Sequence, residues 1–79
     1  MQNELNMTVS PVCVKDGQQY AFVSFSDGSR TAEGRIPECK ILSSSGFETH
    51  EVEQLERYMK RELTKLKKMA ASIRLLDAL

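Results

Sequence analysis

One amphipathic pattern fills the last third of the chain and limits the folds that are open to it. From Val52 to Leu76, apolar residues recur at alternating steps of three and four, which is the spacing of one helix face. Because residues 49–79 contain no proline or glycine, the pattern predicts one helix about 45 Å long. A compact chain of 79 residues is only about 30 Å across. We therefore expect this helix to extend past its own domain.

The helix has a heptad seam, with Glu62 as its one charged member. The first half of the seam, from Val52 to about Leu63, is expected to cover a small sheet, and Glu62 to set the register or mark the end of that contact. The second half then has no surface left within the chain, and an exposed apolar patch of this kind marks an interaction site. We therefore predict a homodimer, parallel or antiparallel, or contact with another protein partner, through Leu66, Met69, Ile73, Leu76 and Leu79.

Residues 9–42 have the composition of an antiparallel meander. Asp16-Gly17 is a two-residue hairpin signal, and Asp27-Gly28-Ser29 is a second turn. Gln19–Ser26 has apolar groups on both faces, so we expect a central strand that is covered on both sides. The strands expected with it are Val12–Lys15 and Arg30–Ile36, with Gly34 at a bulge or close approach, Pro37 as a stop, and Cys39–Leu42 as a fourth strand or a crossover.

The segment before the helix contains its start signals. Ser43-Ser44-Ser45-Gly46 has the composition of a loop. Phe47 is expected to anchor the helix to the sheet, and either Glu48 or Thr49 is the N-cap. The predicted fold is therefore α+β: an antiparallel three- to four-stranded β-meander followed by one long C-terminal amphipathic helix. We expect a single domain over residues 1–79, in which 1–8 are flexible or a weak edge and 47–79 form the helix.

Composition excludes several classes of protein. Eleven basic and eleven acidic residues give zero net charge, which is unlike a strongly basic nucleic-acid-binding protein. The sequence contains no apolar run of about 18 residues, so we expect no membrane span. It has no recognisable signal peptide and only two cysteines, which is typical of a cytoplasmic protein with reduced thiols.

Basic residues concentrate in the middle of the predicted helix, after its acidic start. Such a stripe can face phosphates, and Tyr20, Phe22 and Phe25 could stack bases if one sheet face is open. The ordinary interpretation is that the lysines are solvated and the aromatic rings form the core. Nucleic-acid binding is therefore the alternative function, through Lys60, Arg61, Lys67 and Lys68.

Residues that could perform catalysis are few and far apart in the sequence. Cys13, Cys39 and His50 lack the close pairing of zinc ligands and any local signature of a nucleophile–base pair. We therefore predict no metal, no cofactor and no enzymatic activity; a small enzyme or metal protein built on these three residues is a less favoured hypothesis. The predicted function is a non-enzymatic, homo-oligomerising interaction module that dimerises through the C-terminal helix.

Overall fold

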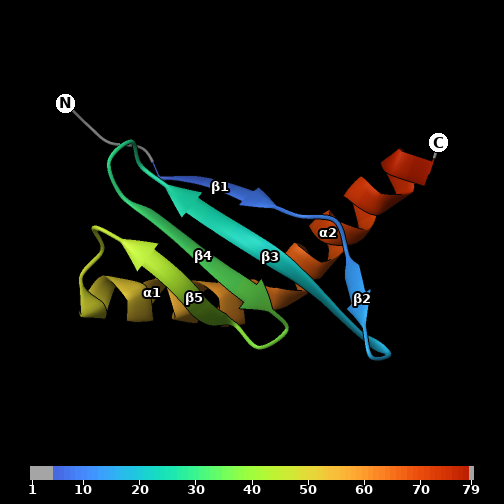
Figure 1. Cartoon of the computed structure of the whole chain (residues 1–79), viewed down its shortest axis with the longest axis horizontal. Helices are drawn as coiled ribbons and strands as arrows, with labels where there is room; N and C mark the ends of the chain where they lie inside the picture. The colour runs from blue at the N-terminus through green and yellow to red at the C-terminus, as the bar shows by residue number, and fades with distance from the viewer. Residues whose placement is uncertain (1–4, 79) are drawn as a thin grey trace.

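A computed structural model describes the backbone of residues 5–78 and the side chains of residues 5–72. An antiparallel sheet forms one layer and two helices pack on one of its faces, which confirms the α+β class (Figure 1). The sheet order is β1-β3-β4-β5, and β2 also pairs with β3. In chain order the elements are β1 (Asn6–Val9), β2 (Cys13–Lys15), β3 (Gln18–Ser26), β4 (Thr31–Ile36), β5 (Lys40–Ser45), α1 (Thr49–Arg61) and α2 (Leu63–Ala78).

Two short strands, β1 and β2, pair with successive parts of β3. The pairing register shifts by one residue between Val9↔Val23 and Cys13↔Tyr20, and Pro11 lies in the gap. Ser10 spans the break, because its backbone N–H donates to Phe22 O and its Oγ accepts from Phe22 N. The segment predicted to be flexible or a weak edge therefore begins a paired edge strand at Asn6. A proline and a register shift in an edge strand hinder pairing with another chain.

The central strand β3 has one covered face. Asp16 and Gly17 both have positive φ, 54° and 77°, which confirms the two-residue hairpin between β2 and β3. Ala21, Val23 and Phe25 face the helices and are buried. The expectation of cover on both faces is wrong: both helices lie on one side of the sheet (Figure 1), and the alternate residues, among them Tyr20 and Phe22, are only half-buried. The rings of Tyr20 and Phe22 partly shield each other, edge to face at 5.6 Å.

The pairing of β4 with β5 contains the irregularity expected at Gly34. The register shifts between Glu33 and Gly34, so that Leu42 is the extra residue of a bulge. Strand β4 ends at Ile36, directly before Pro37, as predicted. The predicted serine loop is instead the end of β5: Ser43, Ser44 and Ser45 pair with β4 and remain exposed. The hydrogen bonds to β4 outweigh the loop-like composition of these three serines, because serine is tolerated on an exposed edge strand.

The free side of β5 has a partner from the helix layer. The backbone N–H of Ile41 donates to Oε2 of Glu56 at 3.0 Å, so a carboxylate of α1 occupies one donor of the edge strand. Helix α1 lies along β5 and β4, while α2 packs against β1 (Figure 1). The two helices therefore cover different parts of the same sheet face.

The helical segment is two helices rather than one. Glu48 is the N-cap of α1, and its backbone N–H donates to the Glu51 carboxylate at 2.9 Å, the reciprocal bond predicted for a Glu48 cap. At Glu62 the backbone turns to φ −102°, ψ 19°, and α2 starts at Leu63. The prediction of one continuous helix is wrong because the chain bends at Glu62. The bend lets each helix bury its own apolar stripe against the sheet.

The core lies between the sheet and both helices. Met59 of α1 and Leu66 of α2 are fully buried, at 0% exposed. Complete burial of a side chain of that size stabilises the fold by about 1.5–3 kcal/mol. Phe47 is partly buried against this core, in agreement with its predicted role as an anchor. The buried apolar residues are Val9, Ala21, Val23, Phe25, Ala32, Ile36, Cys39, Leu55, Met59, Leu66 and Ala70.

Candidate interaction surfaces

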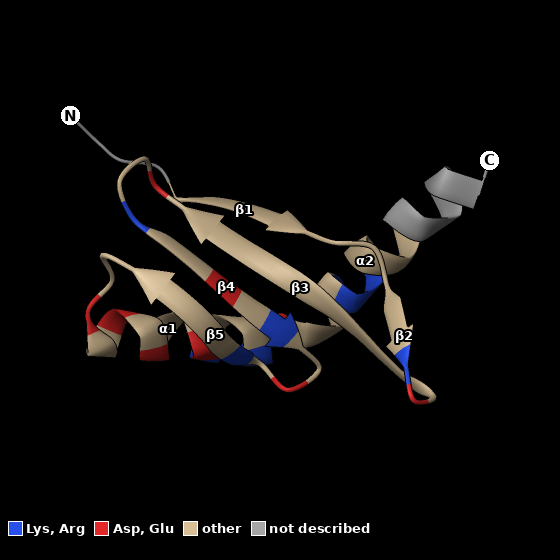
Figure 2. Ribbon diagram, viewed as in Figure 1, with Lys and Arg blue, Asp and Glu red and all other residues tan. Residues whose placement is uncertain are grey.

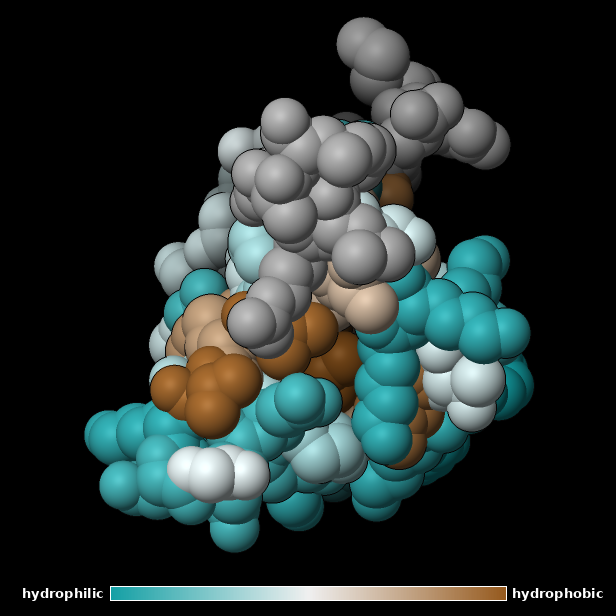
Figure 3. Space-filling model, turned by 90° about the vertical axis from the view of Figure 1, so that its right-hand side faces the viewer, coloured by the Kyte–Doolittle hydropathy of each residue, from teal (hydrophilic) through white to brown (hydrophobic). Residues whose placement is uncertain are grey.

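An apolar groove lies at the end of the molecule where α2 passes the sheet. It encloses about 340 Å³, and its walls come from Val12 directly before β2, from β3, from the end of β4 and from helix α2. Val12, Ile36 and Ala70 line it, with exposed Ala71 and Lys67 on the helix side. Nearby in β2, Val14 is 57% exposed. Figure 3, which views this end, shows hydrophobic residues gathered in the centre of the face with hydrophilic residues below and beside them.

The predicted dimer residues differ in their surroundings. Leu66 is 0% exposed inside the core of its own chain, so it is not available for the dimer interface in which the sequence placed it. The bend at Glu62 turns this part of α2 onto the sheet. Met69 is half-buried against the same core. The side chains of Ile73 and Leu76 lie outside the described part, and so does Leu79 entirely. Sequence reasoning missed Val12 and Ile36 as residues of the groove, because both are distant from α2 in the chain.

The four predicted nucleic-acid contacts are all exposed on the helices: Lys60 and Arg61 at the end of α1, Lys67 and Lys68 in α2. Figure 2 shows α1 acidic near its start, and basic residues around the junction of the helices. A shallow hollow of about 700 Å³ lies at that junction. Its lining includes Arg61, Lys68 and also Lys65, which the sequence placed on the basic stripe but not among the expected contacts.

Of the three sheet aromatics, Tyr20 shares a surface with one of these basic residues, because Tyr20 and Lys67 both line the apolar groove. Phe25 is 2% exposed and packs edge to face on Tyr58 at 6.2 Å, in the core. Tyr20 and Phe22 are on the face of the sheet opposite to the helices. Arg35 lies over the Tyr20 ring at 5.7 Å and pairs with Glu38 at 2.7 Å. A single binding surface that joins all four helix cations to the three aromatic rings is therefore not formed.

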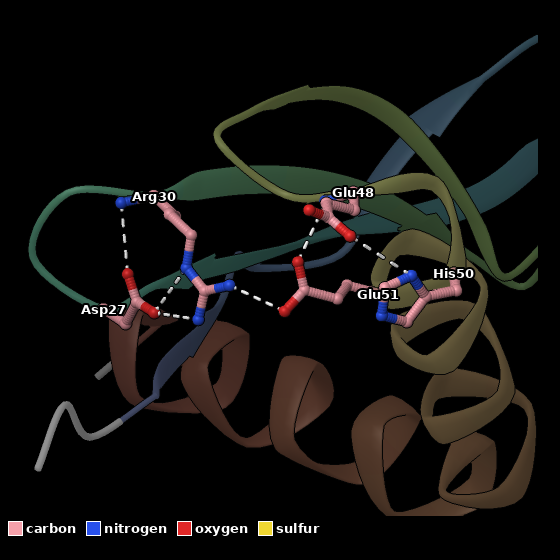
Figure 4. A network of polar contacts seen from close by, with 5 residues as sticks. All are labelled: Asp27, Arg30, Glu48, His50 and Glu51. Carbon is pink, nitrogen blue, oxygen red and sulfur yellow. Dashed lines mark hydrogen bonds and ion pairs between the residues drawn. The ribbon is translucent and has the colours of Figure 1, made fainter.

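A polar network joins the β3–β4 connection to the start of α1 (Figure 4). The Asp27 carboxylate is buried; it accepts from Arg30 N at 3.1 Å, from Arg30 Nε at 2.7 Å and from Arg30 Nη2. Arg30 Nη1 donates to Glu51 Oε2 at 2.7 Å. Glu51 in turn accepts the N-cap N–H of Glu48, and Glu48 lies 3.5 Å from His50 Nδ1. The sequence signalled only the capping part of this network.

The charges in this network stabilise one another. Hydrogen bonds from the Arg30 side chain lower the pKa of Asp27. The Glu48 N–H, and then Arg30, lower the pKa of Glu51. Both carboxylates raise the pKa of Arg30. The three groups therefore hold fixed charges at neutral pH and fasten the sheet to the helix.

The three residues considered for catalysis lie on separate elements. Cys39 is in the β4–β5 turn and His50 in the first turn of α1, at opposite ends of β5 (Figure 1). Burial raises the pKa of the Cys39 thiol, so it is a weak nucleophile. Cys13 is half-buried in β2, and both thiols are free. Within the part that the structure describes, no group of three or more His, Cys, Asp or Glu residues could hold a metal ion.

Comparisons with models of protein families, with curated proteins and with solved structures find no match to this chain. Over residues 5–78, no helix has both the length and the apolar character needed to cross a membrane.

Proposed function

We propose that this chain is a small non-enzymatic interaction module that self-associates through the α2 end of the molecule. The supporting observation is the apolar groove between Val12, Ile36 and the Ala70-Ala71 pair, beside the exposed Val14. An apolar surface that continues from a strand onto a helix is typical of a protein–protein contact. A reducing compartment such as the cytoplasm suits the two free thiols.

A second copy is the occupant that the chain's own chemistry favours. From Met69 to Leu76 the sequence of α2 contains one charged residue, Arg74. A helix segment of this composition needs an apolar partner surface. Ala70 and Ala71 add little side-chain volume, so the axis of another helix can come close to α2. Pairing about a twofold axis gives each copy the same contact.

The proposed contact keeps part of the heptad seam and omits the rest. Leu66 is already used by the core of its own chain. Ala71, on the exposed side of α2, becomes the centre of the proposed helix contact, with Val12 and Val14 on its flank. Ile73, Leu76 and Leu79 remain predicted contacts from the sequence.

The test is the mass of the protein in solution by light scattering at micromolar concentration. We expect twice the chain mass of 8.9 kDa. Ala71→Glu puts a charge into the proposed contact and should shift the protein toward the monomer. Ser72→Glu is the matched control: it adds the same charge at the next exposed residue, which lines the hollow between the helices instead of the groove.

Two results would overturn the proposal. A folded monomer of the unchanged protein at micromolar concentration would show that no second copy binds. Equal masses for the Ala71→Glu and Ser72→Glu variants would show that self-association uses another surface. Circular dichroism of each variant separates lost association from lost folding.

A further inference from the structure

We propose that the hollow at the junction of α1 and α2 binds the phosphate backbone of a nucleic acid duplex. We call this surface the basic bend and define it by Arg61, Thr64, Lys65, Lys68 and Ser72, which line the hollow together with Glu62 and Met69. It exists because the helix axis turns at Glu62. A straight helix would carry the same cations on a convex surface. The bend instead places these cations around a shallow hollow of about 700 Å³.

The lysines of the basic bend have no acidic partner among the residues with described side chains. Arg61 approaches Glu62 at 3.5 Å, whereas Lys65 and Lys68 take part in no ion pair there. Arg61–Lys65 is an i,i+4 pair and Lys65–Lys68 an i,i+3 pair. Each such like-charge pair costs a helix a few tenths of a kcal/mol, about 0.2–0.5. A bound polyanion would turn this repulsion into attraction.

Two further residues of the lining suit phosphate oxygens, whereas Met69 is apolar. Thr64 and Ser72 are exposed and present hydroxyl donors beside the cations. The cations recur about once per helical turn, or about every 5.4 Å. Repeated cations with hydroxyls between them are the groups that contact nucleic acid backbones. Among residues 5–72, whose side chains are described, the acidic member of the lining is Glu62, which lies next to Arg61.

The charge distribution of the whole chain orients the approach of a polyanion. Glu48, Glu51 and Glu53 are near the start of α1, and the basic residues are near the junction (Figure 2). A neutral chain with separated charges attracts an anionic polymer to one end and repels it from the other. The zero net charge of the chain predicts weak, salt-sensitive binding without sequence preference.

A duplex fits this lining better than a single strand does. Single-strand sites combine cations with exposed aromatic rings on which bases stack. No aromatic side chain lines the hollow, and Tyr20 and Phe22 are on the opposite face of the sheet. Recognition would then depend on phosphates alone. A duplex carries one phosphate charge per about 1.7 Å of axis, twice the density of one strand.

The experiment measures fluorescence anisotropy of a labelled duplex DNA of random sequence at increasing salt. With three cations on phosphates, the plot of log affinity against log salt should have a slope of about −3. Lys65→Gln with Lys68→Gln should weaken binding and make the slope shallower by about 2. Lys15→Gln with Lys40→Gln is the matched control, because these exposed lysines are on β2 and β5. The control pair should change binding little.

Several outcomes would overturn the proposal. In two of them, the duplex does not bind at low salt, or both double variants lose the same affinity. In the other two, a single strand binds more tightly than the duplex, or polyglutamate competes as strongly as unlabelled duplex. Ser72→Glu separates this proposal from self-association. It adds a negative charge to the basic bend, so it should weaken DNA binding while the mass in solution stays unchanged. DNA affinity that is unaffected by Ser72→Glu would contradict the assigned surface.

Discussion

Gly34 lies where the sheet and helix α1 are in close contact. A Cβ added there would lie 2.8 Å from Met59 Cε, 2.9 Å from Met59 Sδ and 3.0 Å from the Lys40 carbonyl oxygen. The thioether can move, but the backbone oxygen is held by the β4–β5 pairing. The absence of a side chain at Gly34 is therefore what lets fully buried Met59 pack over the β-bulge.

Gly34→Ala should destabilise the protein by about 1–3 kcal/mol, because it overpacks a filled core. The measurement is urea unfolding followed by circular dichroism. The control is Gly17→Ala, where nothing lies within 4 Å and only the positive φ of 77° is strained. If Gly34→Ala leaves the free energy of unfolding unchanged, the close packing of Met59 on the sheet is contradicted.

At the scale of the elements, the position of α2 decides which apolar residues remain free. Leu66 and Ala70 face the sheet and are buried, while Ala71 and Ser72 are exposed. The turn at Glu62 divides the heptad seam, so residues that look equivalent in the sequence have different surroundings. A seam residue of α2 can therefore belong to the core or to a partner, and the two roles respond differently to protein concentration.

Leu66→Ala should lower the free energy of unfolding by about 2–5 kcal/mol, the usual cost of a cavity in a core. The loss should be the same at low and at high protein concentration, because the contacts removed are within one chain. Denaturant unfolding at two widely separated concentrations measures it. Ala71→Glu is the companion variant, and its effect should grow with concentration if α2 pairs with a second copy. If the free energy of unfolding lost in Leu66→Ala depends on protein concentration, Leu66 takes part in the interface after all.

At the scale of the whole molecule, the network of Asp27, Arg30 and Glu51 joins the sheet to the helix layer. The pKa values of both carboxyl groups are below their ordinary values of 3.8 and 4.5 in the folded state. Their contribution to stability is therefore fully present above those values. It is lost as the pH falls through them toward the lower folded pKa values.

Asp27→Asn should reduce stability at neutral pH, because Arg30 and Glu51 remain but the buried carboxylate is gone. It should also make the loss of stability less steep as the pH falls below the ordinary carboxyl pKa values of 3.8 and 4.5. Unfolding by urea at a series of pH values measures both effects. Asp16→Asn is the control, since Asp16 is exposed in the β2–β3 turn. Parallel pH curves for Asp27→Asn and the unchanged protein would contradict the role of Asp27.

The fold could be predicted from the sequence where a local signal decides the structure. Asp16-Gly17 gave the hairpin, Pro37 the end of β4 and Glu48 the start of α1, because each depends on a few neighbouring residues. The turn at Glu62 could not be predicted, because it arises from the packing of both helices on one sheet face. The groove could not be predicted either, since Val12, the end of β4 and α2 are distant in the chain.

The bond from Ile41 N–H to Glu56 joins the last strand to the first helix, and these two elements are consecutive in the chain. Until α1 has docked, β5 presents a bare edge that includes the half-exposed Leu42. An unprotected edge of this kind recruits strands of other molecules and starts aggregation. Docking of α1 therefore protects the edge of the sheet at β5 from pairing with other molecules. Conditions that loosen α1 without melting the strands should be those in which this protein precipitates.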